Sequence, residues 1–242
     1  MTFVGHKIIP MKVFYTIFAI LLATAILLSA NHYLSSLDLT IHSNTFINAL
    51  FKYQSLAFLI ALSVLFITLK ISPESKQLLK IGNLKTIATK EKWLGINGQT
   101  SWKSSGLQLL FFVSIATGIF MFLGVKHTNS LCNFKWAFIP LVLFISFANS
   151  FSEEIIYRFA INGNLSQHYS KLIVLITSAL LFGLPHYMGY PSGVVGVMMA
   201  GLLGYILSKA TYETKGLGIA WAIHFVQDVI IFTALFMMNV KV

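Results

Sequence analysis

Charged residues are scarce in this chain. Only 10% of its 242 residues are charged and 57% are hydrophobic, with a mean hydropathy of +0.79, whereas about 25% of an ordinary soluble domain is charged. This balance excludes a water-soluble globular domain and indicates a membrane protein that crosses the bilayer several times. The net charge of +10 does not indicate nucleic-acid binding, because the lysines flank apolar segments and form no basic face interleaved with aromatic residues.

Cysteine and arginine each occur once. Because Cys132 stands alone, an internal disulfide and a metal cluster built from cysteines are both excluded. Arg158 is the single arginine among seventeen basic residues, and it follows Glu153 and Glu154 within a hydrophobic stretch. Placing one such charge at the centre of a bilayer costs about 2.5 to 3.5 kcal/mol on insertion scales. Three ionisable groups within six residues therefore indicate transport or catalysis.

Apolar segments of about twenty residues are long enough to cross the hydrocarbon core as helices. We predict an all-α, polytopic transmembrane helix bundle with about seven to eight spans. The seven segments that stand out are residues 11–30, 54–72, 107–125, 136–160, 172–188, 191–208 and 217–240. The first is expected to be an uncleaved helix, because its apolar run is longer than the core of a signal peptide.

The distribution of lysines predicts the orientation, because cytoplasmic loops retain positive charge. With the N-terminus inside, thirteen of the seventeen basic residues lie on the inner side: Lys7, Lys12, Lys70, Lys76, Lys80, Lys85, Lys90, Lys92, Lys103, Arg158, Lys171, Lys209 and Lys215. The outer side holds Lys52, Lys126, Lys135 and Lys241. The N-terminus is therefore expected in the cytoplasm and the C-terminus outside.

The chain is expected to have two regions. Residues 1–92 would form N-terminal membrane helices and a cytoplasmic basic loop that act as scaffold, and residues 93–242 a catalytic membrane core. The long polar stretch 72–105 fits either an amphipathic surface helix or a solvated loop. The apolar residues at near-helical spacing that favour the helix are Leu78, Leu79, Ile81, Leu84, Ile87 and Trp93.

The acidic residues divide between loops and spans. Four of the seven are placed in loops: Asp38, Glu74, Glu91 and Glu213. Glu153, Glu154 and Asp228 fall within apolar spans, as do His186 and His224. All the ionisable groups that would carry chemistry inside the membrane therefore lie in the last hundred residues.

The first polar motif, in the fourth span, contains Glu153, Glu154 and Arg158. Residues four apart on an α-helix share a face, whereas direct neighbours diverge by about 100°. Glu154 is therefore expected to pair with Arg158, while Glu153 points elsewhere as a lone buried carboxylate suited to general-base work. The alternative is a helix end at the interface, with Arg158 snorkelling and both glutamates in contact with water.

The second motif runs from Phe182 to His186 in the fifth span. Pro185 interrupts helical hydrogen bonding, so His186 is expected to project into a cavity lined by irregular backbone. A histidine followed by Tyr187 and Tyr190 also fits an interface anchor.

The third motif is His224 with Asp228 in the last span. These residues are four apart and share a helix face. The arrangement suits an imidazole oriented by a carboxylate, or two ligands of one centre. A polar pair that joins two helices is the alternative.

Together the three motifs, each on its own span, resemble the CPBP family of intramembrane proteases, also called CAAX-protease-like, bacteriocin-processing or Abi. The matching residues are Glu153, Glu154 and Arg158 for the family's EExxxR motif, Phe182 and His186 for FxxxH, and His224 with Asp228 for HxxxN/D. Asp228 stands where many relatives have asparagine. The resemblance covers roughly residues 93 to 235.

The resemblance implies an intramembrane endopeptidase. By that likeness Glu153 would activate a water molecule with His186, and His224 and Asp228 would stabilise the oxyanion. The residues implied as structural support are Glu154, Arg158 and Phe182. The implied partners are the lipid bilayer and a membrane-embedded or lipidated peptide or protein, with no nucleic acid. Composition and the breadth of the family place the chain in a cell membrane as a multi-pass protein, in bacteria the inner membrane.

The chemistry leaves alternatives. A glutamate mechanism without a cofactor is favoured, because the chain has no HExxH helix. Zinc held by His186, His224 and Glu153 is the alternative. Outside peptidase chemistry, the buried polar residues also fit an ion-coupled transporter in which Glu153 and Asp228 relay protons, or a non-catalytic bacteriocin immunity protein.

Overall fold

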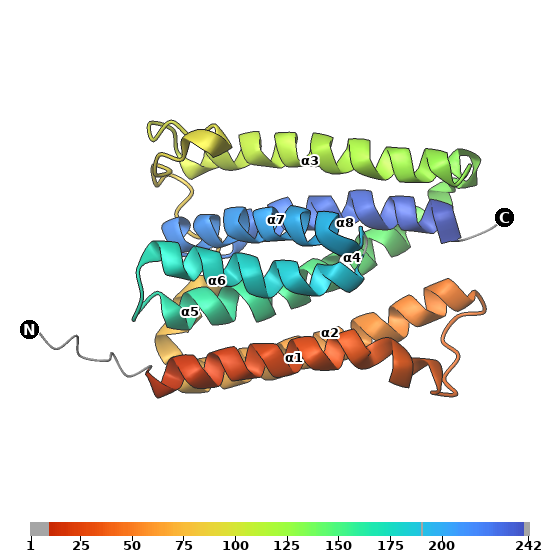
Figure 1. Ribbon diagram of the computed structural model, residues 1–242, viewed down its shortest axis with the longest axis horizontal. Coiled ribbons are helices and arrows are strands. Elements are labelled where there is room, and N and C mark those ends of the chain that lie inside the picture. The colour runs from red at the N-terminus through yellow and green to blue at the C-terminus, as the bar shows by residue number, and fades with distance from the viewer. Residues whose placement is uncertain (1–9, 190, 240–242) are drawn as a thin grey trace, which may run out of the picture.

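A computed structural model describes residues 10–189 and 191–239, and its described part is a bundle of helices without a β-strand (Figure 1). The α-helices are α1 (Met11–Ser35), α2 (Thr45–Ile71), α3 (Trp102–His127), α4 (Ile139–Glu153), α5 (Ala160–Leu165), α6 (Lys171–Gly183), α7 (Gly193–Thr214) and α8 (Gly218–Asn239). A π-helical segment, η5 (Glu154–Phe159), joins α4 to α5. The short 3₁₀ turns are η1 (Pro73–Leu79), η2 (Lys92–Leu94), η3 (Leu131–Asn133), η4 (Trp136–Phe138) and η6 (Leu184–Met188).

Within the described residues, seven helical stretches are long and apolar enough to cross a membrane. Each overlaps one of the seven predicted segments, so the predicted fold class is confirmed and the chain is a multi-pass membrane protein. Lys7, Tyr190 and Lys241, which entered the predictions above, lie outside the described residues, as does residue 240 at the predicted end of the last span.

The second span was predicted to begin at residue 54, and this start is wrong. Helix α2 begins at Thr45, capped by the Asn44 side chain, which accepts a hydrogen bond from the Ile47 amide at 3.1 Å. The charge of Lys52 made the first turns look polar. Its ammonium group donates to the carbonyls of Leu34 and Leu37 at 3.3 and 2.7 Å, so the lysine is accommodated where α1 and α2 meet.

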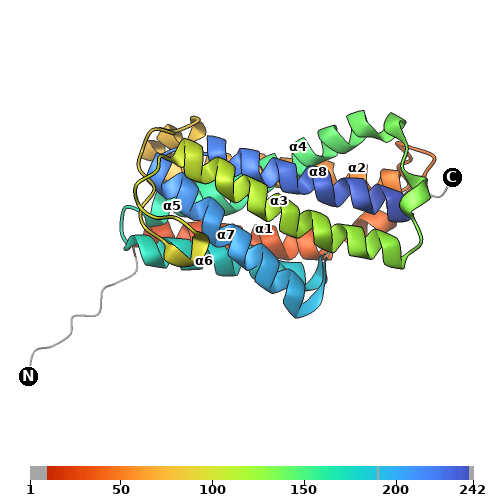
Figure 2. The same cartoon turned by 90° about the horizontal axis from the view of Figure 1, so that it is seen from above.

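The helices run side by side along one axis, and the bundle has a lysine-rich end. Helices α1 and α2 form a hairpin, α4 and α3 each pack on α8, and α6 packs on α7. Figures 1 and 2 both show α3 running alongside α8. The segment between α2 and α3 lies at the end of the bundle where α1 begins (Figure 1). That end also holds most of the lysines assigned above to the inner side.

Of the two structures that the sequence allowed for residues 72–105, the amphipathic surface helix is wrong. After η1 the chain turns at Gly82, Gly95 and Gly98, whose φ angles of 87°, 74° and 84° no helix accommodates. The segment is not a simple solvated loop either, because Ala88 and Ile96 are buried against the ends of α7 and α8. It forms a packed cap over the lysine-rich end.

A buried polar network fastens this cap to α7. Glu213 was predicted in a loop, but it lies in α7 and accepts hydrogen bonds from Lys171, from Lys209 at 2.7 Å and from the Trp102 indole at 2.8 Å. Lys209 is fully buried and also donates to the Thr89 carbonyl at 3.0 Å. Because Lys209 and Glu213 are one helical turn apart, each neutralises the other inside an otherwise apolar helix.

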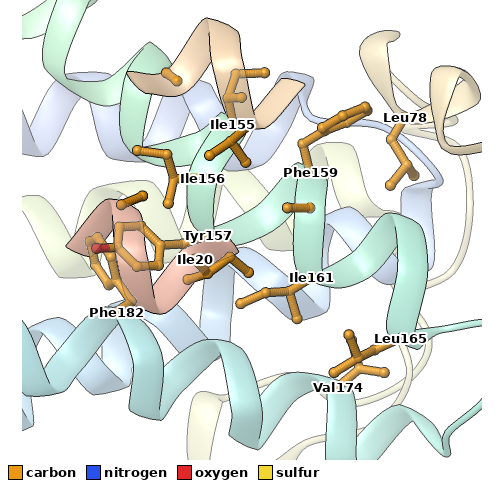
Figure 3. Packing of buried hydrophobic residues seen from close by; sticks show 14 of the residues in the cluster. Ile20, Leu78, Ile155, Ile156, Tyr157, Phe159, Ile161, Leu165, Val174 and Phe182 are labelled. Atoms are coloured by element: carbon orange, nitrogen blue, oxygen red, sulfur yellow. The ribbon is translucent and has the colours of Figure 1, made fainter. Parts of the chain in front are cut away.

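The largest apolar core surrounds the π-helical segment. Figure 3 shows Ile155, Ile156 and Phe159 packed among side chains from other helices. The surrounding residues in this cluster include Ile20, Leu78, Leu165, Val174 and Phe182. Because close packing in membrane proteins depends on van der Waals contact, this cluster holds the fourth span rigidly where its polar motif lies.

Candidate active site

The glutamate motif lies at a break in helical geometry. Helix α4 ends at Glu153, and the backbone widens into the π-helix from Glu154 to Phe159. One carbonyl of this segment, that of Tyr157, accepts a hydrogen bond from the Ser178 hydroxyl at 3.1 Å. Single π-helical turns inside α-helices frequently occur at functional sites.

The predicted pairing of Glu154 with Arg158 is confirmed. The Arg158 Nε atom lies 3.2 Å from Glu154 Oε1, and both side chains are almost wholly buried. The guanidinium carbon lies 3.9 Å from the centre of the Phe182 ring, a cation–π arrangement. The alternative of a snorkelling Arg158 with a water-exposed Glu154 is therefore wrong.

Glu153 was expected to be unpaired, and this is wrong because α8 supplies a partner. The Nε2 atom of His224 lies 3.2 Å from Glu153 Oε2, and its Nδ1 atom lies 2.8 Å from Glu154 Oε1. Asp228 is more distant, with Oδ1 3.7 Å from His224 Nε2. The imidazole of His224 thus bridges the two neighbouring glutamates, and the shared face of His224 and Asp228 is confirmed.

The second motif reaches the same place through a broken helix. Helix α6 ends at Gly183 and continues as the 3₁₀ turn η6, which contains Pro185 and His186. A Cβ atom on Gly183 would lie 2.9 Å from the Cα of Gly201, so the glycine permits α6 to pack closely on α7. The break predicted at Pro185 is confirmed.

The ring of His186 has a defined orientation. Its Nδ1 atom lies 2.8 Å from the Phe182 carbonyl oxygen, which can only accept a hydrogen bond. Nδ1 therefore carries a proton, and in the neutral imidazole Nε2 is left as the acceptor. The Phe182 ring lies between the two histidines, with its centre 4.8 Å from the His186 ring and 5.6 Å from the His224 ring.

A cavity of about 1140 Å³ brings the motif residues together. Four of the predicted site residues line it: Glu153, His186, His224 and Asp228. Its other walls are mostly apolar and come from both halves of the chain, including Leu27 of α1, Leu50 of α2, Phe120 of α3 and Phe232 of α8. The arrangement places two carboxylates and two imidazoles in a largely apolar cavity.

Several polar residues of the cavity did not emerge from the sequence. Asn149 donates to Asp228 Oδ2 at 3.1 Å, and Gln54 of α2 donates to Asn149 Oδ1 at 2.9 Å. Thr24 of α1 and Tyr157 share a hydrogen bond of 2.8 Å between their hydroxyl oxygens. The N-terminal helices are therefore part of the cavity wall. The signal for Asn149 was its position one helical turn before Glu153.

The donor set was tested for a metal ion such as zinc. No group of three or more His, Cys, Asp or Glu side chains within residues 10–189 and 191–239 has the arrangement to hold one. Both ring nitrogens of His224 face glutamate oxygens, and Nδ1 of His186 is engaged by a carbonyl. This arrangement does not fit the zinc set of His186, His224 and Glu153.

Comparison with protein-family models matched residues 135–230 to the family described as Type II CAAX prenyl endopeptidase Rce1-like. No curated protein and no solved structure matched the chain. The matched residues contain all three motifs, whereas the start of the predicted core at residue 93 lies before them and stays a prediction. Residues 135–230 thus match an Rce1-like type II CAAX prenyl endopeptidase domain, as the CPBP resemblance implied, and this match supports a peptidase of the CAAX protease type.

Proposed function

We propose that the chain is an intramembrane endopeptidase that hydrolyses a peptide bond of a membrane-associated protein or peptide with Glu153 as the general base. One observation carries the proposal. Glu153, His186 and His224 come from three different spans and line a single apolar cavity. Polar contacts that only held three helices together would not require a cavity around these groups.

Glu153 is the proposed base because of how its carboxylate is held. His224 contacts Oε2 at 3.2 Å, and no described residue forms a hydrogen bond with Oε1. That oxygen is free to take a proton from a water molecule. His186 assists through Nε2, which its Nδ1 contact leaves as an acceptor.

The proposed reaction follows from these positions. The water oxygen attacks the carbonyl carbon of the scissile bond while its proton passes to Glu153. Once Glu153 is protonated, the Nε2–H group of His224 is released from the carboxylate and can stabilise the oxyanion, with Asp228 orienting the site, because preorganised donors in a site without bulk water act strongly on developing charge. When the C–N bond breaks, Glu153 returns the proton to the leaving amine.

The residues behind the base have a supporting role in this proposal. Glu154 and Arg158 form a buried ion pair that faces away from the cavity. Glu154 also holds Nδ1 of His224, and Phe182 supports Arg158 and both histidines. Together they fix the imidazole that contacts Glu153.

The apolar walls suit a membrane-embedded or lipidated substrate, which would enter from the bilayer. We further propose that the N-terminus is cytoplasmic, since the cap at the lysine-rich end carries six of the predicted inner lysines, Lys76, Lys80, Lys85, Lys90, Lys92 and Lys103. The bacterial inner membrane is the proposed location.

The test is a comparison of peptide termini in membranes that contain the wild type, Glu153→Gln or His186→Ala. The wild type is expected to produce new termini that both variants lack, while all three proteins accumulate in the membrane. Glu74→Gln is the matched control, since Glu74 is an exposed acid in η1 outside the spans, and its termini should match those of the wild type. Wild-type termini in both site variants would overturn the proposal.

A further inference from the structure

Two contacts cross between α4 and α8, and the second involves a residue that none of the motifs contains. Glu153 of α4 meets His224 of α8, with 3.2 Å between Oε2 and Nε2. One turn away, Asn149 of α4 meets Asp228 of α8, with 3.1 Å between Nδ2 and Oδ2. Asn149 and Glu153 are four residues apart on α4, and their partners on α8 are also four residues apart. The four side chains therefore form two parallel contacts between the helices.

The two contacts have opposite polarity. In the first the carboxylate comes from α4 and the nitrogen donor from α8, whereas in the second the donor comes from α4 and the carboxylate from α8. Without Asn149, the carboxylate of Asp228 would be left with His224 Nε2, at 3.7 Å, among its described partners. It would then compete with Glu153 for one ring nitrogen.

Gln54 of α2 determines the orientation of the Asn149 amide. Gln54 of α2 donates to Asn149 Oδ1 at 2.9 Å, so the oxygen of the amide is engaged and the NH₂ group must face Asp228. Asn149 is only half-buried and lines the cavity. Its Nδ2 has two protons and uses one on Asp228.

We propose that Asn149 is a positioning residue of the reaction centre: it holds Asp228 away from Glu153 and leaves the Nε2 atom of His224 to the base. The proposal rests on the proposed function, because it assigns Asn149 to the same hydrolytic site. It also accounts for the carboxylate at position 228. The contact between α4 and α8 pairs one amide with one carboxylate, and here Asn149 of α4 supplies the amide.

The test exchanges the two side chains. Asn149→Asp places two carboxylates opposite each other, and Asp228→Asn places two amides there, whereas Asn149→Asp with Asp228→Asn restores one of each with the polarity reversed. Each single variant is expected to lose roughly 10- to 100-fold in kcat, the range seen when a supporting hydrogen bond of a reactive group is removed. The double variant is expected to regain at least about tenfold over Asn149→Asp.

The measurement uses purified protein in proteoliposomes and a synthetic peptide that spans a cleavage site found by the comparison of termini. Kinetics with this peptide separate kcat from KM, and a positioning role predicts that kcat falls while KM stays within about twofold. Thermal unfolding in detergent is measured for every variant. Asn133→Asp is the matched control, since it adds the same charge in η3, where the one described hydrogen bond of the Asn133 side chain is to the Met237 carbonyl.

Three results would overturn the inference. They are wild-type kcat in Asn149→Asp, no recovery in the double variant, or a loss of kcat that only tracks a fall in melting temperature. Failure of the proposed function itself has a different signature, because Glu153→Gln would then cleave the same peptide as fast as the wild type.

Discussion

The imidazole of His224 lies between two adjacent glutamates, 3.2 Å from Glu153 and 2.8 Å from Glu154. Neighbouring residues on a regular α-helix diverge by about 100°, so one ring meets both because its two nitrogens lie on opposite sides and the backbone changes to a π-helix at Glu154. This contact couples the proposed base to the buried ion pair behind it.

Arg158→Lys is expected to weaken folding and activity without removing the base. Lysine keeps the positive charge opposite Glu154 but loses the planar group that stacks on Phe182 at 3.9 Å. We expect a loss of about 1 to 3 kcal/mol in the free energy of unfolding, less than the roughly 3 to 5 kcal/mol for removing a buried partner altogether. The measurement is thermal unfolding in detergent beside cleavage. Unchanged melting and unchanged cleavage would contradict the supporting role of Arg158.

Phe182→Leu is expected to lower cleavage while the protein still accumulates in membranes. The substitution removes the ring that lies against Arg158 and both histidines. Arg158 loses a cation–π contact worth about 2 kcal/mol, and the two imidazoles lose a common support. Phe111→Leu is the control, because Phe111 is an exposed phenylalanine of α3. Equal cleavage by the two variants would show that Phe182 has no special part in the site.

Removal of metal ions is expected to leave cleavage unchanged. Both nitrogens of His224 and the Nδ1 atom of His186 are engaged by oxygen acceptors of the protein, so the arrangement leaves too few free donors for zinc. Cleavage is measured after dialysis against a strong chelator. A loss that added zinc reverses would contradict the glutamate mechanism and return zinc to the site.

Lys209→Met is expected to loosen the cap formed by the segment between α2 and α3. Lys209 is buried and ties the Thr89 carbonyl to Glu213, and methionine keeps its length but not its charge. Hydrogen exchange should rise around Thr89, and melting should fall by an amount equivalent to about 1 to 3 kcal/mol, because Glu213 keeps Lys171 as a partner. If exchange in the cap stays at the wild-type rate, the network does not fasten it.

The sequence was sufficient for relationships within one helix. The spans follow from hydrophobic length, and the pairs Glu154 with Arg158 and His224 with Asp228 follow from the helical period, because both members of each pair lie on one element. The ion pair between Lys209 and Glu213 could also have been predicted, because these residues are four apart. Their charges instead indicated a loop at the end of α7.

Relationships between helices were beyond the sequence. Glu153 was expected to be unpaired because helical spacing cannot show which residue of α8 faces it. Gln54 reaches Asn149 across ninety-five positions of the chain, and no periodicity reports such a contact. The structure of the cap could not be predicted for a different reason. Apolar residues at near-helical spacing occur there together with glycines that have positive φ angles, which interrupt a helix.

The most direct test of the central claim follows the oxygen of water into the product. Wild-type protein in proteoliposomes is given the cleavage-site peptide in water enriched in oxygen-18, and the new carboxyl terminus is analysed by mass spectrometry. Hydrolysis with Glu153 as the base predicts one oxygen-18 atom in that carboxyl group, and a rate at least roughly 100-fold lower in Glu153→Gln. Product released by Glu153→Gln at the wild-type rate, or a wild-type product without the heavy oxygen, would contradict the account.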